Sequence, residues 1–140
     1  YVPVYRYARD MIGTLNNWVD GWIDWNMVLN RQGGPNWAEN WCVAPVIVDP
    51  AEDEVYYTPL YYTMSHFSRY IRPGAVRIGH QHDDNELLLT AVQNPDGSIV
   101  TVILNQNNES KRVEIEMKGK TSTISIQGKA IQTVVVEAEN

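Results

Sequence analysis

The first part of the chain shows two different hydrophobic spacings. From residue 3 to residue 19, apolar side chains recur every three or four positions, which predicts an amphipathic helix that Asp20 and Gly21 should end. From Gly21 to Asn30 the period falls to two, which predicts a strand with polar groups on one side. Its two faces would be Trp22, Asp24, Asn26 and Val28, and Ile23, Trp25, Met27 and Leu29.

The segments after this strand continue an α/β pattern. A loop rich in Gly, Pro and Asn covers residues 31–40, and a short apolar strand at 45–49 with a hairpin partner at 54–57 comes next. Thr58 and Pro59 predict the start of a second helix, with the Thr58 hydroxyl as its cap. A helix, strand, loop and helix in this order belong to a parallel sheet or an α/β barrel, neither of which they can close alone.

The pattern changes near residue 72, after the second helix ends at about Tyr70. Six later segments are rich in Val, Ile, Leu and Thr and are separated by short turns, of which Pro95-Asp96-Gly97 is the clearest. This spacing predicts a small β-sandwich, so we divide the chain into residues 1–72 and 73–140. The six expected strands cover residues 75–80, 86–93, 98–105, 112–117, 121–127 and 131–137.

Composition excludes several classes of partner. The 140 residues carry a formal net charge of -6 and no cluster of Lys and Arg, which argues against nucleic acid or an anionic membrane as a partner. No apolar run approaches the roughly 18 residues of a membrane span, so no transmembrane segment is expected. Cys42 is the only cysteine, and its apolar neighbours predict a buried, inert thiol.

All five tryptophans lie between Trp18 and Trp41. Amides and the acid Asp24 are interleaved with them, which is the chemistry of a sugar-binding surface. An indole covers the C–H face of a pyranose, and amides and carboxylates bind its hydroxyls. The alternative for any single tryptophan is packing in a core. The interleaved polar residues are Asp24, Asn26, Asn30, Asn36 and Asn40.

Histidines offer a further candidate. His80 and His82 would lie on the same face of a strand, near Asp83 and Asp84, and such a pair can bind zinc. The spacing fixes no third ligand, so a solvated strand end is the favoured interpretation and no metal is expected. His66 is predicted to be a hydrogen-bonded packing residue.

Two long motifs resemble a known family. They are GWIDWNMVLNRQGGPNW and PLYYTMSHFSRYIRPGAVRIG, with a short apolar strand ending in Asp49 between them and a β-rich tail after them. They closely resemble the C-terminal part of glycoside hydrolase family 30, the glucosylceramidase-like retaining β-glycosidases. The resemblance implies the last units of a (β/α)8 TIM barrel followed by a β-sandwich side domain.

The same resemblance assigns roles to residues. Trp25 would match a tryptophan that lines the glycone pocket, and Asn40 an asparagine at the pocket rim. Trp37 and Trp41 would be aromatic neighbours, and Trp41 stands where the family usually carries a smaller aromatic. Asp24 is expected to be an orienting hydrogen-bond acceptor.

Retaining hydrolysis needs two carboxyl groups about 5–5.5 Å apart. The resemblance implies that the family's two catalytic glutamates precede Tyr1, so no catalytic residue and no cofactor are expected in this chain, which alone should be inactive. The implied partners are a glycoside or glycolipid substrate, such as glucosylceramide, and the rest of the barrel polypeptide. The implied location is secreted, periplasmic or lysosomal. The alternative is a non-catalytic carbohydrate-binding or scaffold module.

The incomplete barrel should also expose apolar faces, because the neighbours of its strands are absent from the chain. We therefore expect the isolated chain to be poorly soluble or to form oligomers.

Overall fold

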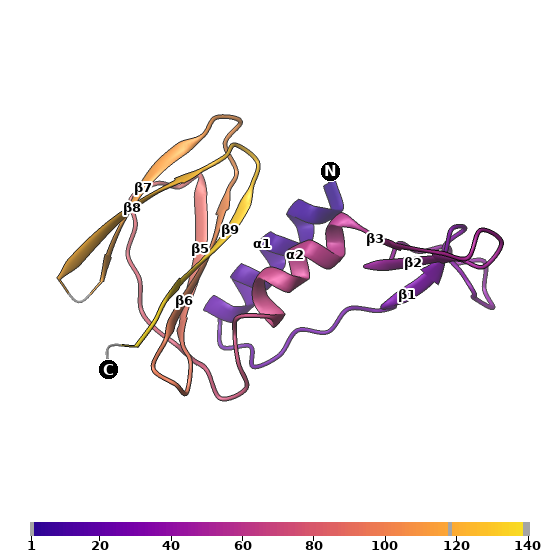
Figure 1. Ribbon diagram of the computed structural model, residues 1–140, viewed down its shortest axis with the longest axis horizontal. Helices are drawn as coiled ribbons and strands as arrows, with labels where there is room; N and C mark the ends of the chain where they lie inside the picture. The colour runs from indigo at the N-terminus through magenta and orange to yellow at the C-terminus, as the bar shows by residue number, and fades with distance from the viewer. Residues whose placement is uncertain (1, 118, 139–140) are drawn as a thin grey trace.

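The computed structural model describes residues 2–117 and 119–138, and their elements form three groups (Figure 1). A small three-stranded sheet projects from one end of a pair of helices, and a β-sandwich packs against the other side of that pair. The expected combination of an α/β part and an all-β part is therefore confirmed. None of the helices among the described residues is long and apolar enough to cross a membrane.

The first helix, α1, covers Val2–Asn16 and buries one face. Ala8, Met11 and Ile12 are the buried positions of the predicted stripe. The helix ends three residues earlier than predicted, because the Thr14 carbonyl accepts hydrogen bonds from the N–H groups of Asn17 and Val19, at 2.9 and 3.3 Å. These bonds close the last turn before the Asp20-Gly21 pair is reached.

The second helix, α2, covers Pro59–Ser68 and buries Leu60, Thr63 and Phe67. Its start at Pro59 confirms the predicted boundary, since proline needs no helical N–H acceptor in the first turn. The predicted capping role of Thr58 is wrong, because its hydroxyl donates to the Ala44 carbonyl at 3.0 Å. Thr58 thus fixes the helix to the segment before the second strand.

The small sheet has the order β1-β2-β3. Strands β1 (Val28–Asn30) and β2 (Val46–Asp49) pair in parallel, and β3 (Glu54–Tyr57) forms an antiparallel hairpin with β2, as predicted. The prediction of a strand throughout residues 21–30 is wrong for residues 21–27. Among the described residues, this segment has no strand beside it, and its backbone is linked to β2 only where Val46 N–H donates to the Met27 carbonyl at 3.0 Å.

The sandwich consists of a four-stranded antiparallel sheet and a separate hairpin. The sheet has the order β4-β5-β6-β9, and the hairpin of β7 and β8 forms the second layer. The predicted segments correspond to these strands, except that β4 is only two residues long because the polar run after it leaves the sheet. The bounds are β4 Val76–Arg77, β5 Leu87–Gln93, β6 Ile99–Asn105, β7 Lys111–Met117, β8 Lys120–Ile126 and β9 Ile131–Val136.

The turn between β5 and β6 forms as predicted. Gly97 has φ 86° and its N–H donates to the Asn94 carbonyl at 2.9 Å, while the Asp96 carboxylate accepts bonds from the N–H and hydroxyl of Ser98. The glycine is needed because this backbone conformation is in the left-handed region.

The molecule has two hydrophobic clusters. The larger one joins the helices to the four-stranded sheet, with Met11 and Phe67 packed against Val100 and Val102 of β6. The smaller one lies between the sheet and the β7–β8 hairpin and centres on Ile103. His66 crosses the first junction, where its Nδ1 lies 2.9 Å from the Thr133 hydroxyl, so its predicted hydrogen-bonded packing role is confirmed.

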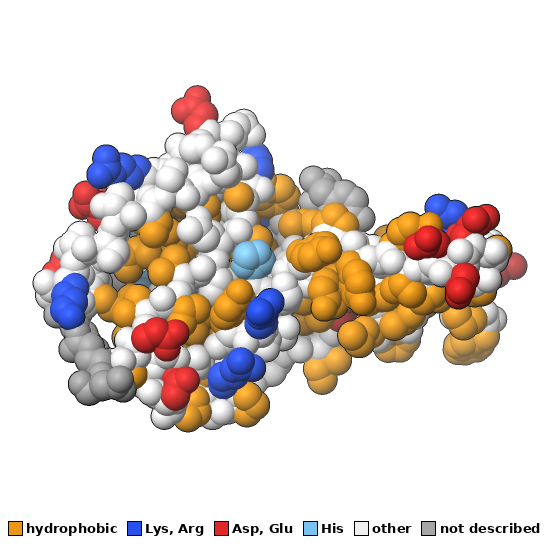
Figure 2. All heavy atoms as spheres, viewed as in Figure 1, with side chains coloured by type: hydrophobic (Ala, Val, Ile, Leu, Met, Phe, Trp, Pro, Cys, Tyr) orange, Lys and Arg blue, Asp and Glu red, His pale blue; other side chains and the backbone are white. Residues whose placement is uncertain are grey.

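The expected exposed apolar faces are present. Hydrophobic side chains spread over the helices and the three-stranded sheet, while charged side chains are scattered over the sandwich and gather at the tip of the three-stranded sheet (Figure 2). Trp25, Ile23 and Met27 are exposed in the segment that was predicted to be a strand. The resulting association in solution stays a prediction.

Candidate carbohydrate-binding cleft

A cleft of about 780 Å³ lies along the first half of α1. Its walls come from three separate parts of the chain: α1, the irregular segment before β1 and the end of the loop between β1 and β2. Aromatic, amide and carboxylate side chains therefore meet in one place although they are far apart in the sequence. The lining residues are Arg6, Tyr7, Asp10, Trp22, Asp24, Trp25, Asn40, Trp41, Cys42 and Val43.

Asp24 joins the first two of these parts. Its Oδ1 accepts a hydrogen bond from the Tyr7 hydroxyl at 2.8 Å and another from the N–H of Trp25 at 2.8 Å. Its Oδ2 is buried and has no hydrogen-bond partner within the described ranges. Burial, together with the bond to the negatively charged Asp24, raises the pKa of Tyr7 to about 12, so the phenol remains a donor at neutral pH.

Asp10 and Trp22 form a second link between α1 and the same segment. The Trp22 Nε1 donates to the Asp10 carboxylate at 2.7 Å, and the Trp22 ring meets Tyr7 edge-on at a centroid distance of 5.3 Å. Tyr7 and Asp10 are three residues apart and therefore share one helix face. Both carboxylates of the cleft thus hold aromatic residues in place.

The loop that carries Trp41 is held by two glycines. Gly33 has φ 92°, and its backbone is so close to Cys42 that an added Cβ would lie 2.4 Å from the Cys42 carbonyl oxygen. An added Cβ on Gly34 would lie 2.9 Å from Cζ3 of Trp41. The Asn30 side chain accepts bonds from the N–H groups of Gln32 and Gly34, at 3.0 and 2.9 Å, which fixes the turn at the end of β1.

The structure brings together four of the five predicted sugar-binding residues. Trp25, Asn40, Trp41 and Asp24 line the cleft, and Trp25 is 82% exposed. Trp37 is 99% exposed and is not among the lining residues. The orienting role expected of Asp24 agrees with its hydrogen bonds, whereas the sugar contacts themselves stay predictions.

Sequence reasoning missed the contribution of α1. Tyr7, Asp10 and Arg6 lie on a polar face of a helix that was predicted only from its apolar stripe. Their spacing of three and four residues would have placed them on one face, but nothing local showed which segment that face meets. The buried position predicted for Cys42 is also wrong, since the thiol is half-buried and its Sγ lies 3.3 Å from the Asn40 carbonyl.

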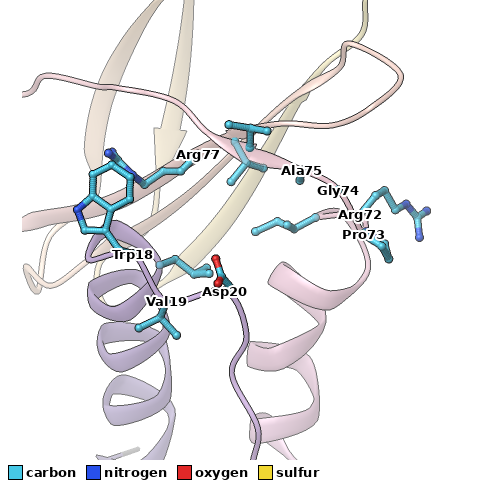
Figure 3. A pocket seen from close by; sticks show the side chains of 12 residues that line it. Trp18, Val19, Asp20, Arg72, Pro73, Gly74, Ala75 and Arg77 are labelled. Carbon is cyan, nitrogen blue, oxygen red and sulfur yellow. The ribbon is translucent and has the colours of Figure 1, made fainter.

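A second cleft, of about 450 Å³, lies at the other end of α1 (Figure 3). It is bounded by the helix end, the turn after α2 and the start of β4, and it shares no lining residue with the first cleft. Trp18 and Arg77 stand together at one end of it.

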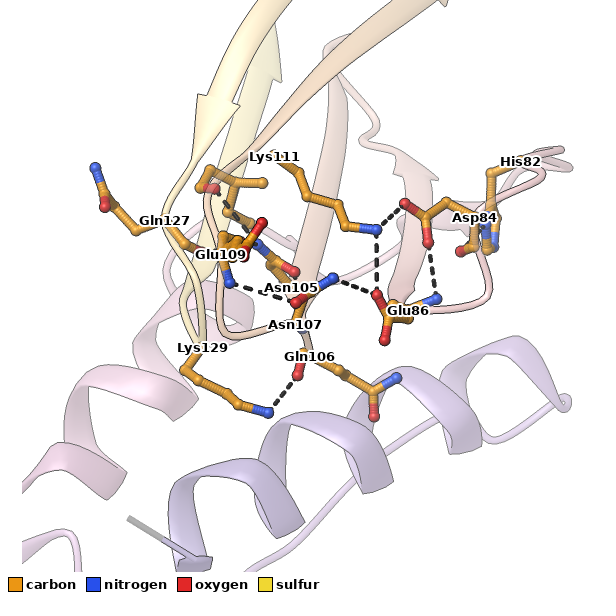
Figure 4. A network of polar contacts seen from close by, with 11 residues as sticks. His82, Asp84, Glu86, Asn105, Gln106, Asn107, Glu109, Lys111, Gln127 and Lys129 are labelled. Carbon is orange, nitrogen blue, oxygen red and sulfur yellow. Dashed lines mark hydrogen bonds and ion pairs between the residues drawn. The ribbon is translucent and has the colours of Figure 1, made fainter.

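The histidines singled out by the sequence do not lie on a strand, because β4 ends at Arg77. The rings of His80 and His82 stack at a centroid distance of 5.8 Å, and His82 Nδ1 lies 3.1 Å from the Asp84 carbonyl. The described residues contain no group of three or more His, Cys, Asp or Glu that could hold a metal ion. The neighbouring acids instead bind Lys111, whose Nζ contacts Asp84 and lies 3.3 Å from Glu86 (Figure 4).

Comparison with known proteins places this architecture in a family. The sequence model described as "Glycosyl hydrolase family 30 TIM-barrel domain" matches residues 3–71, and that described as "Glycosyl hydrolase family 30 beta sandwich domain" matches residues 74–134. The chain belongs to glycosyl hydrolase family 30. Its two parts are accordingly the end of a TIM-barrel domain and a β-sandwich domain, as the sequence motifs implied.

Several curated relatives of this chain are named glucosylceramidase. A protein named putative glucosylceramidase 2 from Caenorhabditis elegans is 45% identical over 103 residues, and the lysosomal acid glucosylceramidase of Mus musculus is 40% identical over 105 residues. These alignments cover 72% and 74% of this chain but only 20% of each relative. The chain therefore spans about a fifth of the length of the curated relatives that it matches.

Solved structures agree with this assignment. SrfJ from Salmonella typhimurium superposes with a TM-score of 0.94 and 33% sequence identity, covering 97% of this chain and 31% of that one. The endo-β1,6-glucanase BT3312 superposes with a TM-score of 0.85 and 28% identity, covering 94% and 31%. These two proteins thus share the arrangement of the helices, the small sheet and the sandwich with this chain.

Proposed function

We propose that this chain forms the C-terminal part of a retaining β-glycosidase that hydrolyses β-glucosides, with glucosylceramide as the favoured substrate. The single observation that carries the proposal is the cleft, where Trp25, Trp41 and Asn40 meet beside the Tyr7–Asp24 hydrogen bond. Support for glucosylceramide comes from relatives: those named glucosylceramidase are 35–45% identical, and the one named endo-1,6-β-D-glucanase is 27% identical.

The indole rings of Trp25 and Trp41 would contact the C–H face of the glucose unit, and the Asn40 amide would bind its hydroxyls. Asp24 supports this arrangement in two ways. It fixes the backbone of Trp25 through the N–H bond, and it holds the Tyr7 hydroxyl at 2.8 Å.

The carboxylates of the cleft are poor candidates for the catalytic pair. Asp10 accepts the Trp22 N–H and Asp24 accepts the Tyr7 hydroxyl, so each already orients an aromatic side chain. Retaining hydrolysis requires a free nucleophile and a general acid facing each other across the glycosidic bond. We therefore assign both catalytic roles to glutamates that precede this segment in the full-length protein, with no cofactor.

The test compares tryptophan variants of the full-length protein on an aryl β-glucoside and on glucosylceramide. Trp25→Ala should lower kcat/KM by about 100-fold or more, because it removes a contact to the reacting sugar. Trp37→Ala removes an indole that is outside the cleft and should have a much smaller effect. Equal effects of the two substitutions would overturn the proposal. It would also be overturned if the wild-type protein bound glucosides but did not hydrolyse them, and that result would favour a non-catalytic binding module.

Stereochemistry tests the retaining mechanism separately. Proton NMR of the fresh reaction should show the β-anomer of glucose first, because double displacement preserves the configuration. Initial release of the α-anomer would contradict the mechanism and leave the substrate assignment intact.

A further inference from the structure

We propose that the second cleft, at the end of α1, is a non-catalytic binding site for a neutral β-linked gluco-oligosaccharide, built around Trp18. The proposal does not depend on the activity assigned to the first cleft. The two clefts share no lining residue, and the first lies beside Arg6, Tyr7 and Asp10 of α1 whereas the second lies at the C-terminal end of that helix.

The backbone of Trp18 is the first observation. This residue has φ 65°, in the left-handed region that glycine or asparagine normally occupies just after a helix. A bulky residue held in this conformation destabilises the fold. The side chain gives little in return, because it is 87% exposed. Contacts within the described residues therefore do not explain a tryptophan here, and we assign its exposed face to a ligand.

The orientation of the ring is the second observation. The guanidinium of Arg77, on β4, lies 5.6 Å from the Trp18 ring centroid (Figure 3). This cation–π contact comes from the sandwich and fixes an indole that is carried by the helical part. A ring held before the ligand arrives loses little conformational freedom when the ligand binds.

The remaining walls provide both apolar and polar surface. Leu15, Ile71 and Val92 line the cleft, and Asp20 and Arg72 lie along it. Within the described part of the chain, the Asp20 carboxylate has no hydrogen-bond partner and is available to a ligand, whereas the Arg72 guanidinium points away from the cleft (Figure 3).

These groups together select the ligand class. An indole face binds the C–H face of a pyranose, and a carboxylate accepts hydrogen bonds from its hydroxyls. Because the Asp20 carboxylate would repel an acidic sugar, a neutral sugar fits better than an acidic one. The volume of about 450 Å³ lies within the range of roughly 300–1,000 Å³ found for small-molecule sites.

The test is isothermal titration calorimetry of the full-length protein with a thio-linked β-glucotriose, whose sulfur linkages resist hydrolysis. The wild type should bind at two sites and Trp18→Gly at one site. Trp18→Phe, which keeps an aromatic face, should retain the second site with an affinity within about tenfold of the wild type. If the proposed function of the first cleft is wrong, the wild type binds at one site and Trp18→Gly at none.

Stability measurements separate loss of binding from misfolding. Because glycine suits φ 65°, Trp18→Gly should raise the thermal midpoint while it removes the site. The kcat/KM of Trp18→Gly on a short aryl β-glucoside should equal that of the wild type. An unchanged number of sites in Trp18→Gly, or the same loss in Trp18→Phe as in Trp18→Gly, would overturn the proposal.

Discussion

The Tyr7 hydroxyl donates to the Asp24 carboxylate across 17 positions of sequence, at 2.8 Å. Through this bond the first helix holds the segment that carries Trp25, whose own N–H donates to the same oxygen. A single carboxylate oxygen thus connects the helix to the aromatic side chain that we assign to sugar binding.

Removing this bond should weaken the fold. Tyr7→Phe deletes the donor to a charged acceptor, and we expect the free energy of unfolding to fall by about 1–2 kcal/mol. The matched control is Tyr5→Phe, because the Tyr5 hydroxyl is buried without a hydrogen-bond partner in the part of the chain that the structure describes. That change should be neutral or stabilising in urea unfolding. Equal destabilisation by both substitutions would contradict the role given to Tyr7.

The same bond predicts that the stability of the fold decreases at alkaline pH. The pKa of Tyr7 is raised by burial and by Asp24 to about 12, above the ordinary tyrosine value of 10.0. Because the pKa is higher in the folded state, its stabilising effect should be complete below pH 10 and be lost as the pH rises through about 12. Burial also raises the pKa of Tyr5, so ultraviolet titration at the phenolate band should show late-ionising tyrosines in the wild type and one fewer of them in Tyr7→Phe. Identical titration curves for the two proteins would count against this assignment.

The two glycines before the proline should respond differently to alanine. Gly33→Ala places a Cβ 2.4 Å from a carbonyl oxygen at φ 92°, so we expect a loss of about 2–4 kcal/mol in unfolding free energy. Gly34→Ala meets only the outer edge of the half-exposed Trp41 ring, which can move. It should cost less than about 1 kcal/mol but raise KM for glucosides. A large stability loss in Gly34→Ala with unchanged KM would contradict this distinction.

Acid should weaken the junction between the helices and the sandwich. Burial lowers the pKa of His66, so the imidazole is neutral where it meets the Thr133 hydroxyl. The unfolded chain therefore binds more protons below pH 6.5, and the stability associated with His66 is lost as the pH falls through that range.

The thermal midpoint should accordingly decrease between pH 7.5 and pH 5 in the wild type, and less so in His66→Gln. His80 also has a pKa lowered by burial and contributes to this slope in both proteins, so the difference between the two curves reports His66. Parallel curves would show that His66 does not titrate with folding.

The sequence was sufficient to predict elements whose conformation depends on residues that are close together in the chain. The β2–β3 hairpin and the strands of the sandwich follow from short apolar runs and from turns such as Asp96-Gly97, whose conformations are set by neighbouring residues. The strand predicted for residues 21–27 was wrong, because a strand requires a hydrogen-bonded partner strand and the hydrophobic periodicity does not show whether one is present.

Only the residues of the cleft that are close together in the sequence could be predicted. Clustered tryptophans and amides identified Trp25, Trp41 and Asn40, since they are close in sequence. Tyr7 and Asp10 contribute through contacts between distant segments, and the left-handed backbone of Trp18 has no signature in its neighbours. Such features depend on how the elements pack.

The cluster that contains Met11, Phe67, Val100 and Val102 has a consequence for the modularity of the protein. The two family matches meet between residues 71 and 74, yet apolar side chains from both sides of that point fill one interior. A sandwich separated at that point would expose this hydrophobic face to solvent, so we do not expect it to be a stable independent domain. The two parts are expected to melt as one cooperative unit and to be inherited together.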